Sequence, residues 1–325
     1  MRGRRCGYDS RMLLPKPRGD FSQALFAHLR LSTDPLPQGV PENADDEAIA
    51  LWALHELHYR GFDDVDDRAE WDPAVLGVRR TLEDRLEQRL RDRWPGPPEV
   101  EGDWAEAFFA HLDTVEGPSL ARFVQRDADR AQVLDLLRWR SVYHLKEADP
   151  TTWVIPRLPT AAKAALVEIQ FDEYGTGDPN KLHANLFAHG LEAVGLRSEY
   201  GAYVDETPWE LLEQNNALSL LGLHRRLRGA ALGHFAAFEA TSSLPSRRLV
   251  QGLERLGLDG PMVDYYAEHV AADAVHEQLA VRGILLPLLQ VEPGLADDVW
   301  FGAWTSQDLE VRTARRVLEL WGVAA

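Results

Sequence analysis

Residues 266–277 read YAEHVAADAVHE and bring three side chains of metal-ligating type, His269, Asp273 and His276, into one short run. An α-helix turns about 100° per residue, so spacings of four and three residues place all three side chains on one helix face. Two imidazoles and one carboxylate form a set with which proteins hold non-heme Fe(II). The run therefore predicts a helix with a metal site on one face. The alternative is a surface helix whose polar stripe contains two histidines.

Helical periodicity extends through nearly every other long segment, and no convincing alternation of apolar and polar residues indicates a strand. The pattern predicts an all-α fold. Asp178-Pro179 and Thr207-Pro208 each place a capping residue before a proline, which is typical of a helix start. The expected helices cover roughly residues 21–31, 45–59, 72–93, 103–115, 119–147, 160–174, 179–194, 208–223, 225–241, 246–256, 261–290 and 306–322.

The composition is that of a folded globular protein, with 45% hydrophobic and 27% charged residues in a chain of 325. The formal net charge of −17 would repel a phosphate backbone, so we expect no nucleic-acid partner. The one cysteine, Cys6, excludes an intramolecular disulfide and a thiolate zinc site, which leaves oxygen and nitrogen ligands. No signal-peptide core or membrane span is visible, so we expect a cytoplasmic protein with no membrane partner.

Composition along the chain predicts three parts. Residues 1–20 are basic and are expected to form a flexible tail. Residues 21–98 are expected to form an N-terminal helical segment that ends in the proline-rich linker 94–98, and residues 99–325 a metal-binding helical domain. The apolar helix faces of the N-terminal segment either cap the larger bundle or mediate a dimer, and these alternatives stay open.

Further ligand-type residues lie outside the 266–277 run. Glu173 and His183 are ten residues apart, on either side of the sequence GTGDP, whose glycines and proline are expected to kink the helix. An irregular backbone can aim two ligands at one point. Glu147 lies at the end of another expected helix, with His144 on its face, whereas His189, His224 and His234 are expected to be packed or capped. No E-x-x-H motif is present, which argues against a ferritin-type di-iron bundle.

Three segments carry a family resemblance: LKEADPTTWVIPRL at 145–158, KAALVEIQFDEYG at 163–175 followed by His183, and His269-x-x-x-Asp273-x-x-His276. Together they resemble the heme-oxygenase-like diiron oxidases and oxygenases, also known as iron-containing redox enzymes. The resemblance runs from about 119 to 290. It implies a heme-oxygenase-like helical bundle with an additional N-terminal helical segment.

The resemblance also implies a ligand set. Glu147 corresponds to the ligand of the first core helix, Glu173 and His183 to those of the second, and His269, Asp273 and His276 to those of the third. Some relatives carry a further carboxylate where this chain has Asn180. Glu239 is the candidate for a seventh ligand; its alternative role is a buried glutamate satisfied by an arginine. The implied cofactors are two Fe(II)/Fe(III) ions, with O2 as co-substrate and no heme.

The function expected from this resemblance is a non-heme diiron oxidase or oxygenase that activates O2. Its substrate would be a small amino-acid-like or carboxylate-bearing metabolite, and its reaction N-oxygenation, desaturation or oxidative C–C cleavage. Arg225 and Arg228 are candidates for holding a substrate carboxylate. An external electron source is a further expected partner, and we expect a homodimer. The open alternatives are a cofactor-independent or other-metal enzyme on the same fold, and a non-catalytic helical binding protein.

Overall fold

The computed structural model describes residues 12–323, and for residues 271–275 it describes the backbone alone. Within this part of the chain the regular structure is helical, and the one β feature is an isolated bridge between Met12 and Phe62. The all-α fold predicted from the sequence is confirmed. Most of the expected basic tail, residues 1–11, lies outside the described residues.

The longer helices have the following bounds: α1 (Asp20–Arg30), α2 (Ala44–Glu56), α3 (Pro73–Arg93), α4 (Trp104–Leu112), α5 (Leu120–Arg126), α6 (Arg130–His144), α8 (Thr160–Glu173), α9 (His183–Ala193), α10 (Trp209–Leu223), α11 (Arg228–Arg255), α12 (Pro261–Gln278) and α14 (Ala296–Leu320). Two short helices, α7 (Asp149–Thr152) and α13 (Leu286–Val291), and a π-helical stretch, η7 (Leu279–Leu285), complete the core. No single described helix is long and apolar enough to cross a membrane, although a pair bent by 118°, residues 276–291 and 293–320, meets that test jointly.

Two expected helix caps are wrong. The segment expected to begin at Pro179 is a turn, because Asp178 accepts hydrogen bonds from the backbone N–H groups of Asn180 and Lys181, and α9 begins only at His183. Thr207 does not cap α10; its hydroxyl donates instead to the carbonyl of Tyr203.

Three helix lengths also differ from expectation. The helix expected at 119–147 is divided, because Asp129 and Gln132 form a reciprocal cap that starts α6. The two helices expected on either side of Pro245 are one, α11, which continues through the proline. Hydroxyl groups bond to backbone carbonyls just before it, Thr241 to Ala237 O at 2.7 Å and Ser242 to Glu239 O at 3.2 Å. The last helix, α14, begins ten residues before the expected start at 306.

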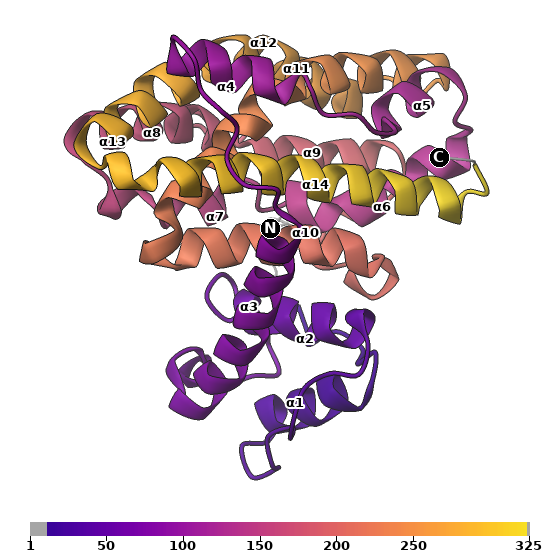
Figure 1. The fold of residues 1–325 in the computed structure, drawn as a ribbon. Helices are drawn as coiled ribbons and strands as arrows, with labels where there is room; N and C mark the ends of the chain where they lie inside the picture. The colour runs from indigo at the N-terminus through magenta and orange to yellow at the C-terminus, as the bar shows by residue number, and fades with distance from the viewer. Residues whose placement is uncertain (1–11, 324–325) are drawn as a thin grey trace.

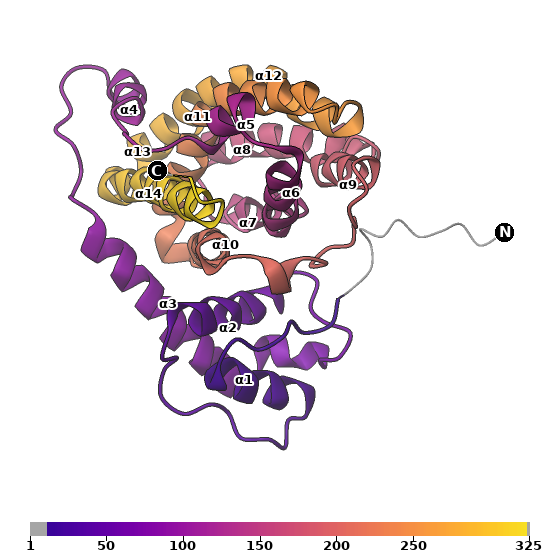
Figure 2. The ribbon, with the colours of Figure 1, turned by 90° about the vertical axis from the view of Figure 1, so that its right-hand side faces the viewer.

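The larger helices form a bundle that surrounds the candidate site. Seen along the bundle, α6, α8, α9, α10, α11, α12 and α14 form a ring (Figure 2). The long α11 packs against both α12 and α14. A Cβ atom added at Gly233 or Gly302 would collide with the backbone of the facing helix, so these glycines let α11 and α14 approach closely. The small residues of α11 therefore serve close helix packing at this crossing.

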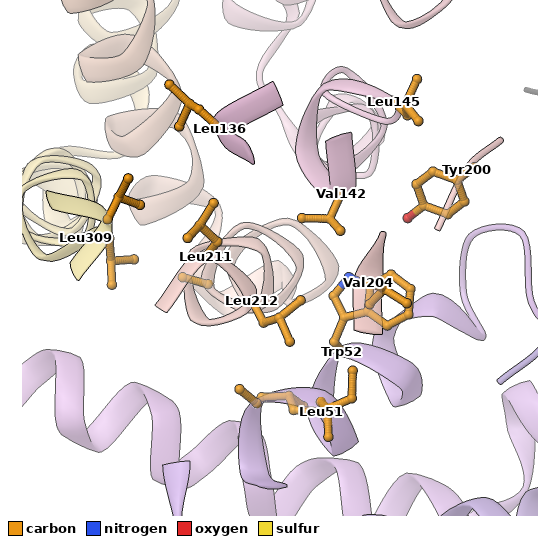
Figure 3. Close-up of a cluster of buried hydrophobic side chains, with 14 of the residues drawn as sticks. Leu51, Trp52, Leu136, Val142, Leu145, Tyr200, Val204, Leu211, Leu212 and Leu309 are labelled. Carbon is orange, nitrogen blue, oxygen red and sulfur yellow. The ribbon is translucent and has the colours of Figure 1, made fainter. Parts of the chain in front are cut away.

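The N-terminal helices α1 to α3 form a lobe below α10 (Figure 1). Every residue of α2 from Asp46 to Glu56 is buried. Leu51 and Trp52 of α2 face Leu211 and Leu212 of α10 in one continuous apolar core, which crosses the expected boundary at residue 98 (Figure 3). The apolar faces of this segment thus cap the bundle within one chain. They no longer argue for a dimer, which stays a prediction.

Candidate metal centre

A glycine turn brings the end of α8 to the start of α9. Glu173 is the last residue of α8 and His183 is the first of α9. Between them Gly175, Thr176 and Gly177 have positive φ values of 72°, 54° and 86°. A Cβ atom at Gly175 would lie 2.5 Å from the backbone nitrogen of Leu182. The backbone can therefore fold back on itself this closely only because residue 175 is glycine.

The first triad of ligand-type side chains consists of Glu147, His183 and His269, whose potential ligand atoms all lie within 4.8 Å of one another. Glu147 Oε1 is 3.8 Å from His269 Nε2 and 3.9 Å from His183 Nδ1. All three residues are buried, with 9% or less of their surface exposed. Glu147 Oε1 and His183 Nδ1 have no hydrogen-bond partner among the described residues. The three atoms point at a common space without bonding to one another.

The second triad consists of Glu173, Glu239 and His276, which also lie within 4.8 Å of one another. His276 Nδ1 is 3.4 Å from Glu239 Oε2 and 3.9 Å from Glu173 Oε1, and it too has no hydrogen-bond partner among the described residues. Glu239 projects from the middle of α11 and is 5% exposed. Across the described residues no arginine pairs with this carboxylate, so it does not fill the alternative role of a glutamate satisfied by an arginine.

Glu173 connects the two triads. Its Oε1 faces His276, whereas its Oε2 lies 3.0 Å from His183 Nδ1, in the first triad. The two oxygens of one carboxylate therefore face separate sets of ligands, as in a carboxylate shared between two metal ions.

The donor set fits two divalent ions. Three carboxylates and three imidazoles converge in a buried space, and oxygen and nitrogen donors of this kind suit iron. Without metal, protonated imidazoles balance part of the charge of these buried carboxylates, and divalent cations would take over that role. The ligand atoms of Glu147, His183 and His276, which form no well-aligned hydrogen bond among the described residues, would find their partners in the metals.

Neighbouring groups fix the orientation of the candidate ligands. His269 Nδ1 donates to the carbonyl of Tyr265 at 2.9 Å, which leaves Nε2 as the lone-pair nitrogen facing Glu147. His276 Nε2 lies 3.3 Å from Asp172 Oδ2, which leaves Nδ1 facing the second triad. The Tyr265 hydroxyl donates to Glu147 Oε2 at 2.8 Å. His144, expected on the face of Glu147, lies there, with Nδ1 3.2 Å from the same oxygen.

Protons are held by this site in the absence of metal. Burial raises the pKa of Glu147 to about 7, reinforced by the charge of Glu173. Burial lowers the pKa of His183, but the close contact with Glu173 outweighs it and raises that pKa to about 9. Likewise Glu239 outweighs burial and raises the pKa of His276 to about 9. Metal binding at neutral pH would therefore displace protons from both imidazoles.

Two cavities larger than a single water molecule border the triads. The smaller, about 30 Å³, touches both of them through Glu147, Glu173, Glu239 and His269, and His234 lines its wall. This volume suits one or two water-sized molecules. The larger, about 300 Å³, touches only the first triad, through Glu147 and His269. Its volume is at the lower end of the range for small-molecule sites.

Not every predicted residue lies at the site. Asp273 falls within 271–275, whose side chains lie outside the described part of the structure; its backbone is helical, between His269 and His276 on α12. The structure does not bring Arg225 or Arg228 to the triads: Arg225 is exposed, and Arg228 forms an ion pair with Glu292.

Sequence reasoning missed three residues that touch the candidate ligands or their cavity. Tyr265 is four residues before His269, on the same helix face, and this spacing could have revealed its contact with Glu147. Asp172 adjoins Glu173 in the chain, but its contact with His276 depends on a helix a hundred residues away. Arg140 lines the larger cavity one turn before His144, a spacing that was visible in the sequence.

A family model described as iron-containing redox enzyme matches residues 134–311, which is more than half of the chain. The match contains every candidate ligand, from Glu147 to His276, and excludes the lobe formed by α1 to α3. No curated protein matches the chain. The chain belongs to the iron-containing redox enzymes, and its all-α bundle has the heme-oxygenase-like fold of that family.

Proposed function

We propose that this iron redox enzyme is a non-heme diiron oxidase or oxygenase that activates O2 and oxidises a small amino-acid-like or carboxylate-bearing metabolite. The observation that carries the proposal is the position of Glu173, whose two carboxylate oxygens face two separate buried triads. One ion would be held by Glu147, His183 and His269, and the other by Glu239 and His276, with Glu173 shared. Asp273 is a further candidate ligand by its place on α12.

Bound iron would supply the electrons for reducing O2 and thereby the oxidising power for the substrate. The chain's own part is positional. Tyr265 holds Glu147 by donating to Oε2, which leaves Oε1 directed at the two imidazoles of the first triad. The Tyr265 carbonyl fixes the tautomer of His269. Buried walls around both triads exclude bulk water, which preserves the strength of these contacts.

The two cavities suggest where the reactants lie. The smaller one borders both triads and is large enough only for O2 or water, while the larger one can hold a metabolite against the first triad. A substrate there would lie against Glu147 and His269. N-oxygenation, desaturation and oxidative C–C cleavage all fit this arrangement.

Oxygen consumption after anaerobic loading tests the proposal. Purified protein is loaded with Fe(II) under nitrogen, mixed with oxygenated buffer, and followed with an oxygen electrode; parallel samples receive Mn(II) or Zn(II). We expect oxygen uptake with Fe(II) in wild type and in Glu168→Ala, whose exposed side chain lies on α8 five residues before Glu173. Glu173→Ala should lose it. Uptake that is unaffected by Glu173→Ala, or that occurs only with Mn(II), would contradict the diiron assignment.

A further inference from the structure

The smaller cavity lies where the two triads meet. Its lining includes candidate ligands from both of them, namely Glu147, His269, Glu239 and the shared Glu173. At about 30 Å³ it has room for one or two water-sized molecules and none for a metabolite. Any ligand that enters this cavity is therefore small, and it would reach candidate ligands of both ions.

A buried histidine lines the same cavity without a hydrogen bond. His234 projects from α11 and is 3% exposed, and neither of its ring nitrogens has a partner among the described residues. Burial lowers the pKa of His234 to about 4, so at neutral pH the ring is uncharged and carries one N–H donor. A buried donor without an acceptor costs free energy, and a small ligand that accepts from it would remove this cost.

The position of His234 on α11 explains why it lines the cavity but belongs to neither triad. The residues that line the cavity from this helix recur at spacings of three and four, which define one helix face: Ala231, His234, Phe235, Phe238 and Glu239. His234 precedes Glu239 by five residues, which is about 7.5 Å along the helix axis. This separation suits contact with a ligand bound to the metal better than contact with the metal itself.

A second unpartnered donor lines the cavity from α8. Gln170 is 3% exposed and lies one turn before Glu173. Its amide oxygen accepts from the Thr152 hydroxyl at 3.2 Å, whereas its amide nitrogen has no hydrogen-bond partner among the described residues. No lysine or arginine is among the described residues that line this cavity. Its two donors are therefore neutral, and they add no positive charge that would compete with metal ions for the carboxylates.

Neutral donors beside a metal site suit a ligand that gains negative charge as it binds. We propose that His234, supported by Gln170, donates a hydrogen bond to the small oxygen ligand of the candidate diiron centre and holds that ligand in the smaller cavity. The inference rests on the proposed function, because iron would bind the near atom of the ligand. O2 takes electron density from Fe(II), and a donor placed where that density develops stabilises it.

Four variants separate hydrogen bonding from the shape of the cavity. His234→Leu removes both ring nitrogens and keeps a buried apolar side chain, whereas His234→Gln keeps an N–H donor. Gln170→Leu removes the second donor. The matched control is Phe235→Leu, at the next position on α11, which changes the wall of the same cavity without removing a polar atom.

Nitric oxide bound to the Fe(II)-loaded, full-length protein provides the test, because NO is diatomic like O2, binds Fe(II) and accepts hydrogen bonds. Infrared spectroscopy with isotopically labelled NO gives the N–O stretching frequency, and trapping of released NO gives its dissociation rate. We expect the wild-type frequency to lie below that of His234→Leu and to shift in heavy water, because the hydrogen bond draws electron density onto NO.

Each variant has its own expected result. His234→Leu should lose the heavy-water shift and release NO roughly tenfold faster, which corresponds to the loss of one hydrogen bond to a charged acceptor. His234→Gln should restore part of both effects, and Gln170→Leu should release NO several-fold faster. Phe235→Leu should keep the wild-type frequency and heavy-water shift.

The proposal is overturned if His234→Leu has the wild-type frequency and release rate, if His234→Gln restores neither, or if Phe235→Leu changes both as much as His234→Leu does. Iron content and oxygen uptake of the same samples separate this inference from the proposed function. Two bound ions and oxygen uptake, with no effect of His234→Leu on bound NO, would overturn this inference alone. Protein that binds no iron would overturn the proposed function, and with it the oxygen ligand on which this inference rests.

Discussion

Glu173 differs from the other candidate ligands because its two oxygens face different triads. A carboxylate in this position would affect both candidate metal sites at once, whereas Glu239 belongs to the second triad alone, where its Oε2 lies 3.4 Å from His276 Nδ1. The two glutamates are equally well buried, at 8% and 5% exposed, so a difference between them cannot come from burial. It has to come from geometry.

That difference predicts two distinct losses of iron. Glu239→Ala should remove one of two bound ions, because the first triad keeps its ligands. Glu173→Ala should remove both or leave a single ion bound at least about tenfold more weakly, in the range seen when a metal site loses a supporting group. Metal analysis after gel filtration, with circular dichroism as a check of folding, measures both. Two ions retained in Glu173→Ala, or a single ion bound there as tightly as in Glu239→Ala, would show that Glu173 is not shared.

His234 predicts a pH dependence of stability that is separate from metal binding. It is 3% exposed, neither ring nitrogen has a hydrogen-bond partner among the described residues, and burial lowers its pKa to about 4. In the unfolded chain this imidazole takes up a proton near its ordinary pKa of about 6.5, whereas in the folded chain it takes one up only near pH 4. The free energy of unfolding therefore falls as the pH is lowered from about 6.5 to about 4.

The magnitude at pH 5 is about 2 kcal/mol, which is 1.5 pKa units at about 1.4 kcal/mol each. Denaturant unfolding of the metal-free protein at pH 7 and pH 5 measures how far the free energy of unfolding falls between these pH values. The fall should be about 2 kcal/mol smaller in His234→Leu than in wild type. His189→Leu, which replaces an exposed histidine, should behave as wild type. A wild-type pH dependence in His234→Leu would mean that this imidazole is protonated in the folded protein.

At the residue scale, spacing within one helix was the most useful signal in the sequence. It placed His269 and His276 on one face of α12, and it placed His144 beside Glu147. It could not reveal that Glu239 faces His276, because that contact joins α11 to α12 and depends on how the helices pack. For the same reason Arg225 and Arg228 were predicted to bind substrate, whereas Arg140, which reaches the cavity from α6, was not considered.

At the scale of elements, the α8–α9 turn determines whether Glu173 and His183 can meet. On a continuous helix, a spacing of ten residues would separate the two side chains by about 15 Å along the axis. Three successive residues with positive φ reverse the chain instead, and Gly175 lies against the backbone of Leu182. Glycines and Pro179 indicated this break in the sequence, but the start of α9 at His183 followed from the turn around Asp178, which looked like a cap.

Alanine at the two glycines of this turn should have different effects. Both have positive φ, so each substitution costs about 1–2 kcal/mol of backbone strain. Nothing lies within 4 Å of a Cβ atom at Gly177, whereas one at Gly175 would strike Leu182, which adds about 1–3 kcal/mol. Gly175→Ala should therefore unfold at lower denaturant than Gly177→Ala and bind less iron, as measured by urea unfolding and metal analysis. Equal loss in both variants would exclude the close contact as the cause.

Proline was the least reliable signal for helix boundaries. One helix was expected to end at 241 and another to begin at 246, on either side of Pro245, yet α11 continues through the proline, with nearby hydroxyl groups bonding to the Ala237 and Glu239 carbonyls. Tertiary packing against α12 and α14 supports α11 along its length. Local sequence cannot show this support, because it comes from helices elsewhere in the chain.

At the scale of the whole molecule, the N-terminal lobe and the bundle share one core. Glu56 at the end of α2 forms a buried ion pair with Lys146, the residue before Glu147, at 3.1 Å, and accepts from the Tyr200 hydroxyl at 2.7 Å. Trp52, on the same helix, is 1% exposed and packs with residues of α10. The sequence left open whether this lobe covers the bundle, because apolar faces alone do not identify the surface they pack on.

Cooperative unfolding follows from this shared core. Trp52→Ala should lower the free energy of unfolding by about 3–5 kcal/mol, as expected for a large buried side chain. Calorimetry should still record a single transition at a lower temperature, with loss of iron binding at that same transition. Trp71→Ala, which removes a tryptophan side chain 69% exposed on the lobe, is the control and should change little. Two separate transitions in Trp52→Ala would show that lobe and bundle are independent units.

The central claim is that two buried triads joined by Glu173 hold two iron ions, and counting bound iron tests it most directly. The full-length protein is titrated with Fe(II) under nitrogen, separated from free metal, and analysed for metal content, for heme absorption and by Mössbauer spectroscopy. The account predicts two high-spin, non-heme Fe(II) ions per chain in wild type, one in Glu239→Ala, and no heme. One ion in wild type, none at all, or iron retained only as heme would contradict it.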